Sequence, residues 1–225
     1  RYGELDFVEK RTAEAVAAGY DYVKLHERTP EAVEAARVGG GAGVKIMVDT
    51  NCPWTPAEAL EIGDAMADYG VHWLEEPVWP PENFDGLAEV RAKGLCPIAA
   101  GENASTAWEF QKMFQAGAVD WAQPSVAKVG GVTETRKISV LAEAANVGLA
   151  LHSPYFGPGF VASMHLLAAH NGAKAQVERL YGNLEASLYG DLFEPDAAGR
   201  LAMQTGPGLG VDPDPDVMRD FALPD

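Results

Sequence analysis

Three carboxylates occupy equivalent places in this sequence, each closing a short apolar segment: Asp49, Glu75 and Glu102. Any one of them alone would be an ordinary loop or turn residue. Three carboxylates that converge in one cleft repel one another, and a divalent cation relieves that repulsion. Because all the donors are oxygens, we predict a site for Mg²⁺ rather than for zinc, with Mn²⁺ also chemically suitable.

Four further polar residues close other apolar segments. Lys24 and His26 lie two residues apart, so in a strand both side chains point to the same side. His152 and Glu178 end the last two apolar segments. Without a catalytic role, the aliphatic part of Lys24 would simply cover apolar surface and His26 would lie at the edge of the barrel. Beside a metal site, these groups would instead move protons at the carbon next to a bound carboxylate.

Short apolar segments alternate with amphipathic ones along most of the chain. The strand-like segments are residues 22–26, 44–49, 71–75, 98–102, 119–123, 148–152 and 175–178. Helix-like segments between them include residues 56–69, 106–116 and 133–146, and several end at a glycine suited to a left-handed cap: Gly19, Gly70, Gly117 and Gly148. Such alternation predicts right-handed βαβ units and a parallel sheet.

The spacing of the strand ends favours a barrel. The closing polar residues lie at positions 26, 49, 75, 102, 125, 152 and 178, so neighbours are 23 to 27 residues apart. A complete (β/α)8 barrel needs eight strands and about 250 residues, so we expect the first strand to lie upstream of this sequence. We predict a barrel over residues 1–183 and a tail over 184–225 that packs on the barrel or on a capping domain.

The alternative to a barrel is an open, doubly wound sheet, which normally carries a glycine-rich phosphate loop after its first strand. No GxGxxG or P-loop motif is present, and the glycine run at 39–43 precedes a strand. We therefore interpret that run as a flexible loop.

Composition narrows the function classes. The 225 residues carry a formal net charge of −16, and 47% are apolar, as in globular proteins. This charge argues against nucleic acid or an anionic membrane as partner. No apolar run approaches the roughly 18 residues of a membrane span, and the first residues do not resemble a signal peptide. Cys52 and Cys96 form neither a disulfide framework nor a CxxC motif, which suits a reducing cytoplasm.

Five segments together resemble the enolase superfamily, most closely its mandelate racemase/muconate lactonizing enzyme branch. They are Val-Asp-Thr-Asn (48–51), Trp-Leu-Glu-Glu-Pro (73–77), Ala-Gly-Glu-Asn (100–103), Lys-Val-Gly-Gly (128–131) and Val-Glu-Arg (177–179). The resemblance implies a TIM-type (β/α)7β barrel behind an α+β capping domain, with that domain and the first strand missing from these residues. It also implies an essential Mg²⁺ and removal of a proton α to a carboxylate.

The same resemblance assigns roles on the first three strands. It makes Asp49, Glu75 and Glu102 the metal ligands. Lys24 matches the first lysine of the family's Lys-x-Lys pair, and His26 replaces the second, so either one would be the base. Asn51 matches a position that touches a substrate hydroxyl in some relatives.

Roles on the last strands follow in the same way. His152 matches the strand-seven histidine that acts as acid or base, and Glu178 matches a glutamate that binds the substrate carboxylate or enediolate. Ser125 stands where relatives carry an Asp or a catalytic Lys on strand six, and we predict that it contacts substrate. The loop that begins at Tyr155 follows His152 and is expected to line the pocket or to be an ordinary loop.

These features predict a Mg²⁺-dependent enzyme acting on a small carboxylate, with dehydration of a sugar acid as the first expectation. Cycloisomerisation and racemisation or epimerisation are alternatives, because they share the enediolate and differ only in the second step. Outside the enzymes, the alternative is a binding protein: a barrel that binds a metal and a sugar acid without catalysis. The resemblance further implies a homo-oligomer of two to eight subunits.

Overall fold

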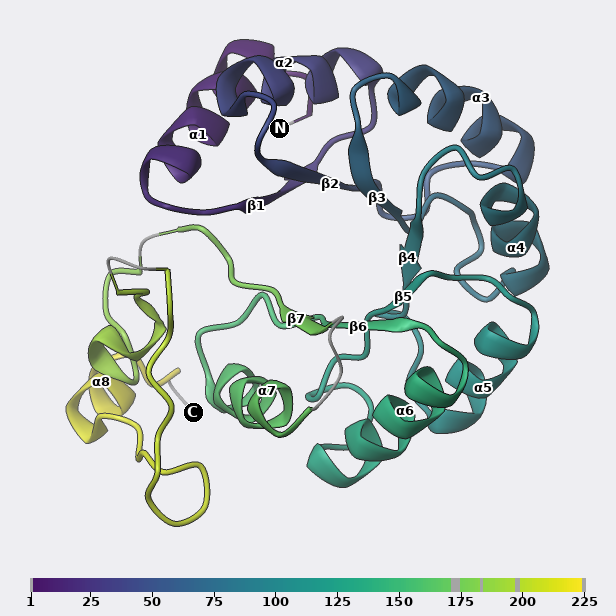
Figure 1. Cartoon of the computed structure of the whole chain (residues 1–225). Coiled ribbons are helices and arrows are strands. Elements are labelled where there is room, and N and C mark those ends of the chain that lie inside the picture. The colour runs from purple at the N-terminus through teal and green to yellow at the C-terminus, as the bar shows by residue number, and fades with distance from the viewer. Residues whose placement is uncertain (1, 171–174, 183, 197–198, 224–225) are drawn as a thin grey trace.

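The computed structural model describes residues 2–170, 175–182, 184–196 and 199–223, in which strands and helices alternate up to residue 177 (Figure 1). The strands are β1 (Tyr22–His26), β2 (Lys45–Asp49), β3 (Val71–Glu75), β4 (Ile98–Ala100), β5 (Trp121–Ala122), β6 (Gly148–Leu151) and β7 (Ala175–Val177). The helices among them are α1 (Leu5–Ala17), α2 (Pro30–Gly40), α3 (Pro56–Ala67), α4 (Phe84–Ala92), α5 (Ala107–Gln115), α6 (Val132–Ala144) and α7 (Pro158–Ala169).

The strands form one parallel sheet in chain order from β1 to β7. Figure 1 shows this sheet curled into an incomplete ring, with α1 to α7 around its outer face. Within the described residues no pairing joins β7 back to β1, so the sheet is a curled half-barrel. The predicted α/β barrel architecture with seven consecutive strands is confirmed.

Several strands end earlier in the structure than the sequence predicts. The segment 98–102 ends as a strand at Ala100, 119–123 ends at Ala122, and 148–152 ends at Leu151. After β4 the chain turns away at Gly101, which has a φ of 141°. A Cβ there would lie 2.8 Å from the ring of Phe110, so the turn requires glycine. Glu102 therefore lies on the loop after its strand.

Local signals set the helix boundaries. Thr55 and Glu58 form a capping box at the start of α3, with Pro56 in the first turn. The predicted left-handed glycine caps are confirmed at Gly19, Gly70 and Gly117. The one predicted at Gly148 is wrong. Asn146 takes the left-handed conformation instead, and Gly148 opens β6 where a Cβ would lie 2.6 Å from the Trp121 ring.

The glycine run at 39–43 is not wholly the loop that we predict. Gly39 and Gly40 form the last turn of α2, and the loop begins after them. A Cβ on Gly39 would lie 2.1 Å from the carbonyl oxygen of Glu9 in α1. Glycine therefore allows the backbones of α1 and α2 to approach closely.

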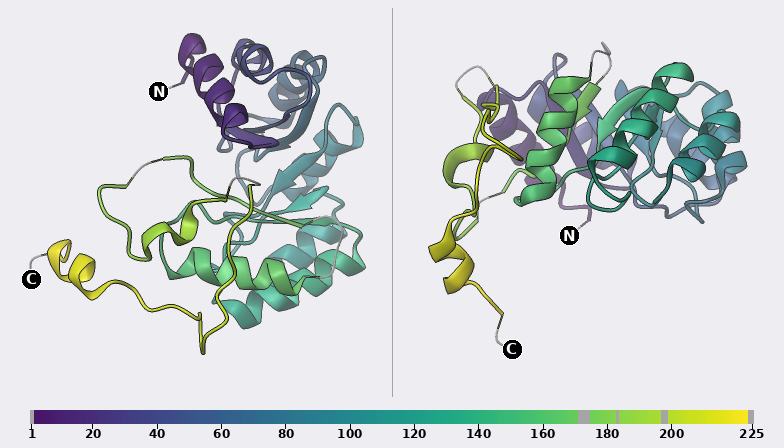
Figure 2. Two further views of the ribbon diagram at one scale, coloured as in Figure 1. Left: turned by 60° about the vertical axis from the view of Figure 1, so that its left-hand side comes forward. Right: turned by 90° about the horizontal axis from the view of Figure 1, so that it is seen from below.

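The remaining described residues form a tail that contains η1 (Gly190–Phe193) and α8 (Pro215–Asp220). Phe193 is buried against Phe160 of α7, with ring centroids 5.0 Å apart. Figure 2 shows α8 standing away from the barrel. The division into two regions at residue 183 stays a prediction. No helix in the described part of the chain combines the length and apolar character needed to span a bilayer.

Apolar side chains cover both faces of the sheet. The larger cluster packs the strands against the surrounding helices. A smaller cluster of Met47, Trp73, Ala99 and Ala150, with Trp121 beside it, lies on the inner face. Because strand side chains alternate between faces, residues two positions beyond Met47 and Trp73 also point inward, and these are Asp49 and Glu75.

Candidate active site

The site begins with three inward-pointing residues at one level of the sheet. His26 is in register with Asp49, and Asp49 is in register with Glu75. Each lies at the carboxyl end of its strand, the end at which barrel enzymes carry their active sites. Lys24 lies one layer deeper on the same face, and its long side chain extends up to this level.

Asp49, Glu75 and Glu102 come together as the sequence predicts. Each offers one carboxylate oxygen, and these atoms all lie within 4.8 Å of one another. Asp49 and Glu75 are fully buried and Glu102 is half-buried, so the negative charges are poorly screened. Three oxygen donors at this separation suit a hard divalent cation. The carboxylate triad, as we call these three residues, can therefore hold a metal ion.

Lys24 provides the positive charge of the site. Its Nζ lies 3.0 Å from Asp49 Oδ2, 2.7 Å from Glu75 Oε1 and 2.7 Å from Glu178 Oε1. Burial alone would lower the pKa of Lys24, but these three carboxylates outweigh it and hold the pKa far above its ordinary value. The side chain is an ammonium group that links β1 to β2, β3 and the end of β7.

Asp49 is held by neighbours on both sides. Its Oδ2 lies 2.8 Å from His26 Nε2, and its Oδ1 accepts from the backbone amide and the Nδ2 of Asn51 at 3.1 and 3.0 Å. Burial works to raise the Asp49 pKa, yet the hydrogen bond from His26 and the charge of Lys24 bring it below its ordinary value. The same hydrogen bond raises the pKa of His26. The predicted contact of Asn51 with a substrate hydroxyl stays a prediction.

Glu75 has a hydrogen-bond partner, Trp73, that is not among the predicted site residues. The indole Nε1 of Trp73 donates to Glu75 Oε2 at 3.0 Å. Trp73 precedes Glu75 by two residues, so the alternation of strand side chains was the signal available for this contact. Burial raises the pKa of Glu75. Trp73 and Lys24 thus occupy both oxygens of this carboxylate.

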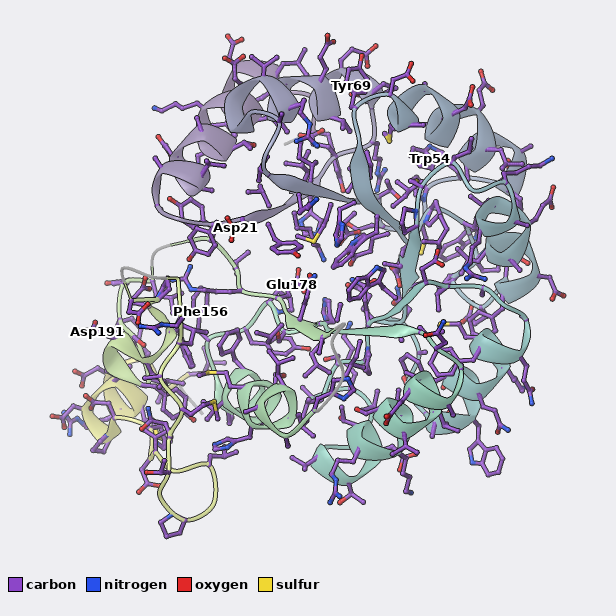
Figure 3. All side chains as sticks on the ribbon, viewed as in Figure 1. Asp21, Trp54, Tyr69, Phe156, Glu178 and Asp191 are labelled. Atoms are coloured by element: carbon purple, nitrogen blue, oxygen red, sulfur yellow. The ribbon has the colours of Figure 1, made fainter. Side chains whose placement is uncertain are left out.

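His152 and Glu178 complete the ring of charged groups. His152 Nε2 lies 2.7 Å from Glu102 Oε2 and 4.0 Å from Glu178 Oε2, while Glu178 Oε1 binds Lys24. Burial would raise the pKa of Glu102, but the hydrogen bond and charge of His152 lower it. Figure 3 shows Glu178 on the inner side of the curled sheet. Glu178 therefore lies between the amino group of Lys24 and the imidazole of His152.

Ser125 and Tyr155 lie on the other side of the His152 ring. The Ser125 hydroxyl is fully buried and shares a hydrogen bond with the Tyr155 hydroxyl. That hydroxyl lies 3.3 Å from His152 Nδ1 and donates to the His152 carbonyl oxygen at 3.2 Å. From the sequence, the loop that begins at Tyr155 is expected to line the pocket or to be an ordinary loop, because nothing in a Gly/Pro loop indicates which way a tyrosine turns. The predicted substrate contact of Ser125 stays a prediction.

A cavity of about 320 Å³ lies between the two edge strands of the sheet. Lys24 and Glu178 form part of its wall, together with Trp73, Gln123 and Arg179. Of the charged groups of the site, Lys24 and Glu178 therefore border this open space, whereas the carboxylate triad and His152 do not line it.

Comparisons with known proteins agree with this geometry. The sequence model of the family described as Enolase C-terminal domain-like matches residues 8–217. D-galactarolactone cycloisomerase of Agrobacterium fabrum is 31% identical over 226 aligned positions, which cover 95% of this chain and 60% of that protein. D-xylonate dehydratase of Haloferax volcanii is 32% identical over 207 positions, which cover 88% of this chain and 49% of that protein.

Comparison with a solved structure indicates the same family. The 3,6-anhydro-D-galactonate cycloisomerase from Zobellia galactanivorans superimposes with a TM-score of 0.84 at 26% identity, over 98% of this chain and 64% of that one. The chain thus spans between 49% and 64% of the length of these three relatives. The chain belongs to the mandelate racemase/muconate lactonizing enzyme branch of the enolase superfamily and corresponds to its C-terminal barrel domain.

Proposed function

We propose that this site removes the proton α to the carboxylate of a sugar acid and then expels a β-hydroxyl group as water. One observation carries the proposal: Glu178 lies between Lys24 and His152, 2.7 Å from the first and 4.0 Å from the second, beside the carboxylate triad. Lys24 and His152, the groups proposed to move protons, thereby lie close to the proposed metal site, where a carboxylate substrate would bind.

The carboxylate triad is the place for the metal ion. Asp49, Glu75 and Glu102 would hold Mg²⁺, which when bound supplies a Lewis acid that makes the α-proton of a carboxylate easier to remove. The triad draws its oxygens from two neighbouring strands and the loop after a third, so the sheet itself sets their separation.

The two sides of the site have different tasks. His26, or Lys24 after it has lost a proton, takes the α-proton, and in either case Lys24 is then an ammonium group that stabilises the negative charge on the enediolate. His152 then gives its proton to the β-hydroxyl, the C–O bond breaks, and water leaves with the electron pair of that bond. The resulting enol becomes a 2-keto-3-deoxy acid.

Cycloisomerisation is the second candidate. The 31% identical Agrobacterium relative is a cycloisomerase that acts on a sugar-acid lactone by its name. His152 also has neutral hydroxyl partners at Nδ1 rather than an acidic one. In this reaction His152 would give its proton to a ring oxygen as the bond to the β-carbon breaks, and no water would be released.

The test is proton exchange by the full-length protein with Mg²⁺, followed by ¹H NMR in D₂O over a panel of sugar acids and lactones. We expect one substrate to lose its α-proton signal. Lys24→Met and His152→Asn should slow this loss by about 100-fold or more. Lys93→Met, the same change at an exposed lysine, should leave it unaltered.

The product separates the candidates. A 2-keto-3-deoxy acid supports dehydration. An opened lactone that is isomeric with the substrate, apart from exchanged hydrogen, supports cycloisomerisation. Absence of exchange across the panel, with Mg²⁺-dependent thermal stabilisation by one member, would instead support a barrel that binds without catalysis.

A further inference from the structure

The three residues of the carboxylate triad are held in place by different means. Asp49 and Glu75 end β2 and β3, and these strands are paired in register at that point. Glu102 lies two residues past β4, on a turn that the Ala104 amide closes by donating to the Gly101 carbonyl oxygen at 3.1 Å. No strand pairing within the described residues reaches Glu102. Contacts of this loop therefore set the place of the third oxygen donor.

Glu76 provides a contact that joins this loop to the loop after β2. Its side chain is buried, and its Oε1 and Oε2 accept from Asn103 Nδ2 at 3.1 and 2.8 Å. Its Oε2 also accepts from Cys52 Sγ at 3.4 Å. Asn103 follows Glu102 directly, and Cys52 lies three residues beyond Asp49. The Glu76 carboxyl group therefore connects two loops that each carry a triad residue.

The backbone of Glu76 is fixed against the loop after β2 as well. The Cys52 amide donates to the Glu76 carbonyl oxygen at 2.7 Å, and the buried Thr50 Oγ1 donates to it at 3.0 Å. Glu76 has a φ of 45°, and Asn51 and Cys52 have φ values of 52° and 51°. Residues other than glycine keep this left-handed conformation only where surrounding contacts hold it. The conformation of both loops therefore depends on the contacts between them.

Stability alone gives little reason for a carboxyl group at position 76. Within the described part of the chain, no lysine, arginine or histidine pairs with Glu76, whose side-chain donors are a thiol and the carboxamide of the exposed Asn103. Burial of a carboxyl group is unfavourable unless hydrogen bonds compensate for the lost water. The place of Glu76 between the two loops does give a reason, because the bond to Asn103 restrains the residue next to Glu102.

We propose that Glu76 is a positioning residue that, through Asn103, holds Glu102 at its place in the carboxylate triad. The inference rests on the metal site of the proposed function but needs no substrate. Contacts of this kind behind metal ligands typically change metal affinity by about 10- to 100-fold. Mg²⁺ demands near-ideal octahedral geometry, whereas Ca²⁺ accepts flexible geometry. Loss of the contact should therefore weaken the binding of Mg²⁺ more than the binding of Ca²⁺.

The experiment measures dissociation constants for Mg²⁺ and Ca²⁺ on the full-length protein by isothermal titration calorimetry. Asn103→Ala removes the donor at an exposed position, and Glu76→Gln keeps the size of the side chain but replaces one oxygen by a donor. Each should weaken Mg²⁺ binding by about 10-fold or more and Ca²⁺ binding by about threefold or less. Ser105→Ala, at an exposed residue of the same loop, should leave both constants unchanged.

The double variant tests whether the two residues act as a pair. Glu76→Gln combined with Asn103→Ala should bind Mg²⁺ no more weakly than Asn103→Ala alone, because both changes break the same contact. Unchanged Mg²⁺ affinity in either single variant, additive losses in the double variant, or equal losses for the two cations overturns the proposal. Lower stability in EDTA with unchanged Mg²⁺ affinity would make Glu76 a purely structural residue.

Amide hydrogen exchange in EDTA gives a measurement that requires no metal. The Ala104 amide, which closes the turn that carries Glu102, should exchange faster in Asn103→Ala and in Glu76→Gln than in the wild type. Unchanged exchange in both variants would overturn the positioning role. A wild type that binds no Mg²⁺ would remove the proposed function, and the exchange of Ala104 would then still decide whether Glu76 holds the loop.

Discussion

At the scale of single residues, Lys24 balances the charge of the site. Its ammonium lies within 3.0 Å of oxygens from Asp49, Glu75 and Glu178, and only 12% of its side chain is exposed. Removing one partner of a buried ion pair leaves the other charges uncompensated, which costs more than the pair itself contributes. Lys24 therefore holds the site together in addition to its proposed part in the reaction.

We expect Lys24→Met to lower the free energy of unfolding by about 3 kcal/mol when measured by urea denaturation at pH 7 with EDTA. Methionine keeps the length and apolar body of the side chain, so the loss reports the charge. Adding Mg²⁺ should recover part of that loss, because a cation at the triad replaces the missing charge. Lys93→Met should change the stability by less than about 0.5 kcal/mol. Equal stability of wild type and Lys24→Met in EDTA would contradict this account.

At the scale of elements, two helical glycines differ in how closely a neighbouring element approaches them. In α2, a Cβ at Gly39 would lie 2.1 Å from the Glu9 carbonyl oxygen, and a backbone atom cannot move aside as a side chain can. In α3, a Cβ at Gly63 would lie 3.6 Å from Leu95 and 3.8 Å from Leu74, which are ordinary contacts. Both residues lie in α-helices, where alanine is intrinsically preferred to glycine, although less strongly in the last turn of α2 than in the interior of α3.

We therefore expect opposite effects from the same substitution. Gly39→Ala should destabilise the protein by about 1–2 kcal/mol, since the cost of separating α1 from α2 exceeds the gain in helix propensity. Gly63→Ala should stabilise it by about 0.5–1 kcal/mol. Thermal and urea denaturation of the two variants beside the wild type measure both effects. Stabilisation by Gly39→Ala would show that the α1–α2 contact is looser than described.

At the scale of the whole molecule, Arg179 links the two edges of the curled sheet. It follows the end of β7, and its Nη1 donates at 3.0 Å to the hydroxyl of Tyr20, which precedes β1. Its Nε donates to the Phe193 carbonyl oxygen at 2.6 Å, which adds the tail to the same contact. With Lys24 and Glu178, this pair spans the gap between edge strands that do not pair with each other.

Arg179→Met should lower the free energy of unfolding by about 2 kcal/mol, because the partly buried oxygens of Tyr20 and Phe193 lose their donor. Amide hydrogen exchange should quicken in β1 and β7 more than in β3 and β4. A double-mutant cycle with Tyr20→Phe isolates the link across the edges. Arg219→Met, at an exposed arginine of α8, should have an effect below about 0.5 kcal/mol. Uniform exchange changes across all strands would argue against a local link.

The sequence by itself determined the strand repeat and which polar residues lie at the ends of the strands. Apolar segments at near-constant spacing specify seven strands, and the strand period of two specifies which side chains share the inner face. Asp49, Glu75, His152 and Glu178 could be located because a parallel barrel brings all strand ends together, whichever helices lie between.

Only the tertiary structure decided how these groups share partners. The bonds of Lys24 to three carboxylates, and of Tyr155 to His152 and Ser125, join residues from different strands and loops. The end of β4 at Gly101 and the tight contact at Gly39 depend likewise on the Phe110 ring and on the backbone of α1. Sequence patterns record the preference of each residue for a face or a turn. Distances between side chains far apart in the chain are set only when all the elements pack together.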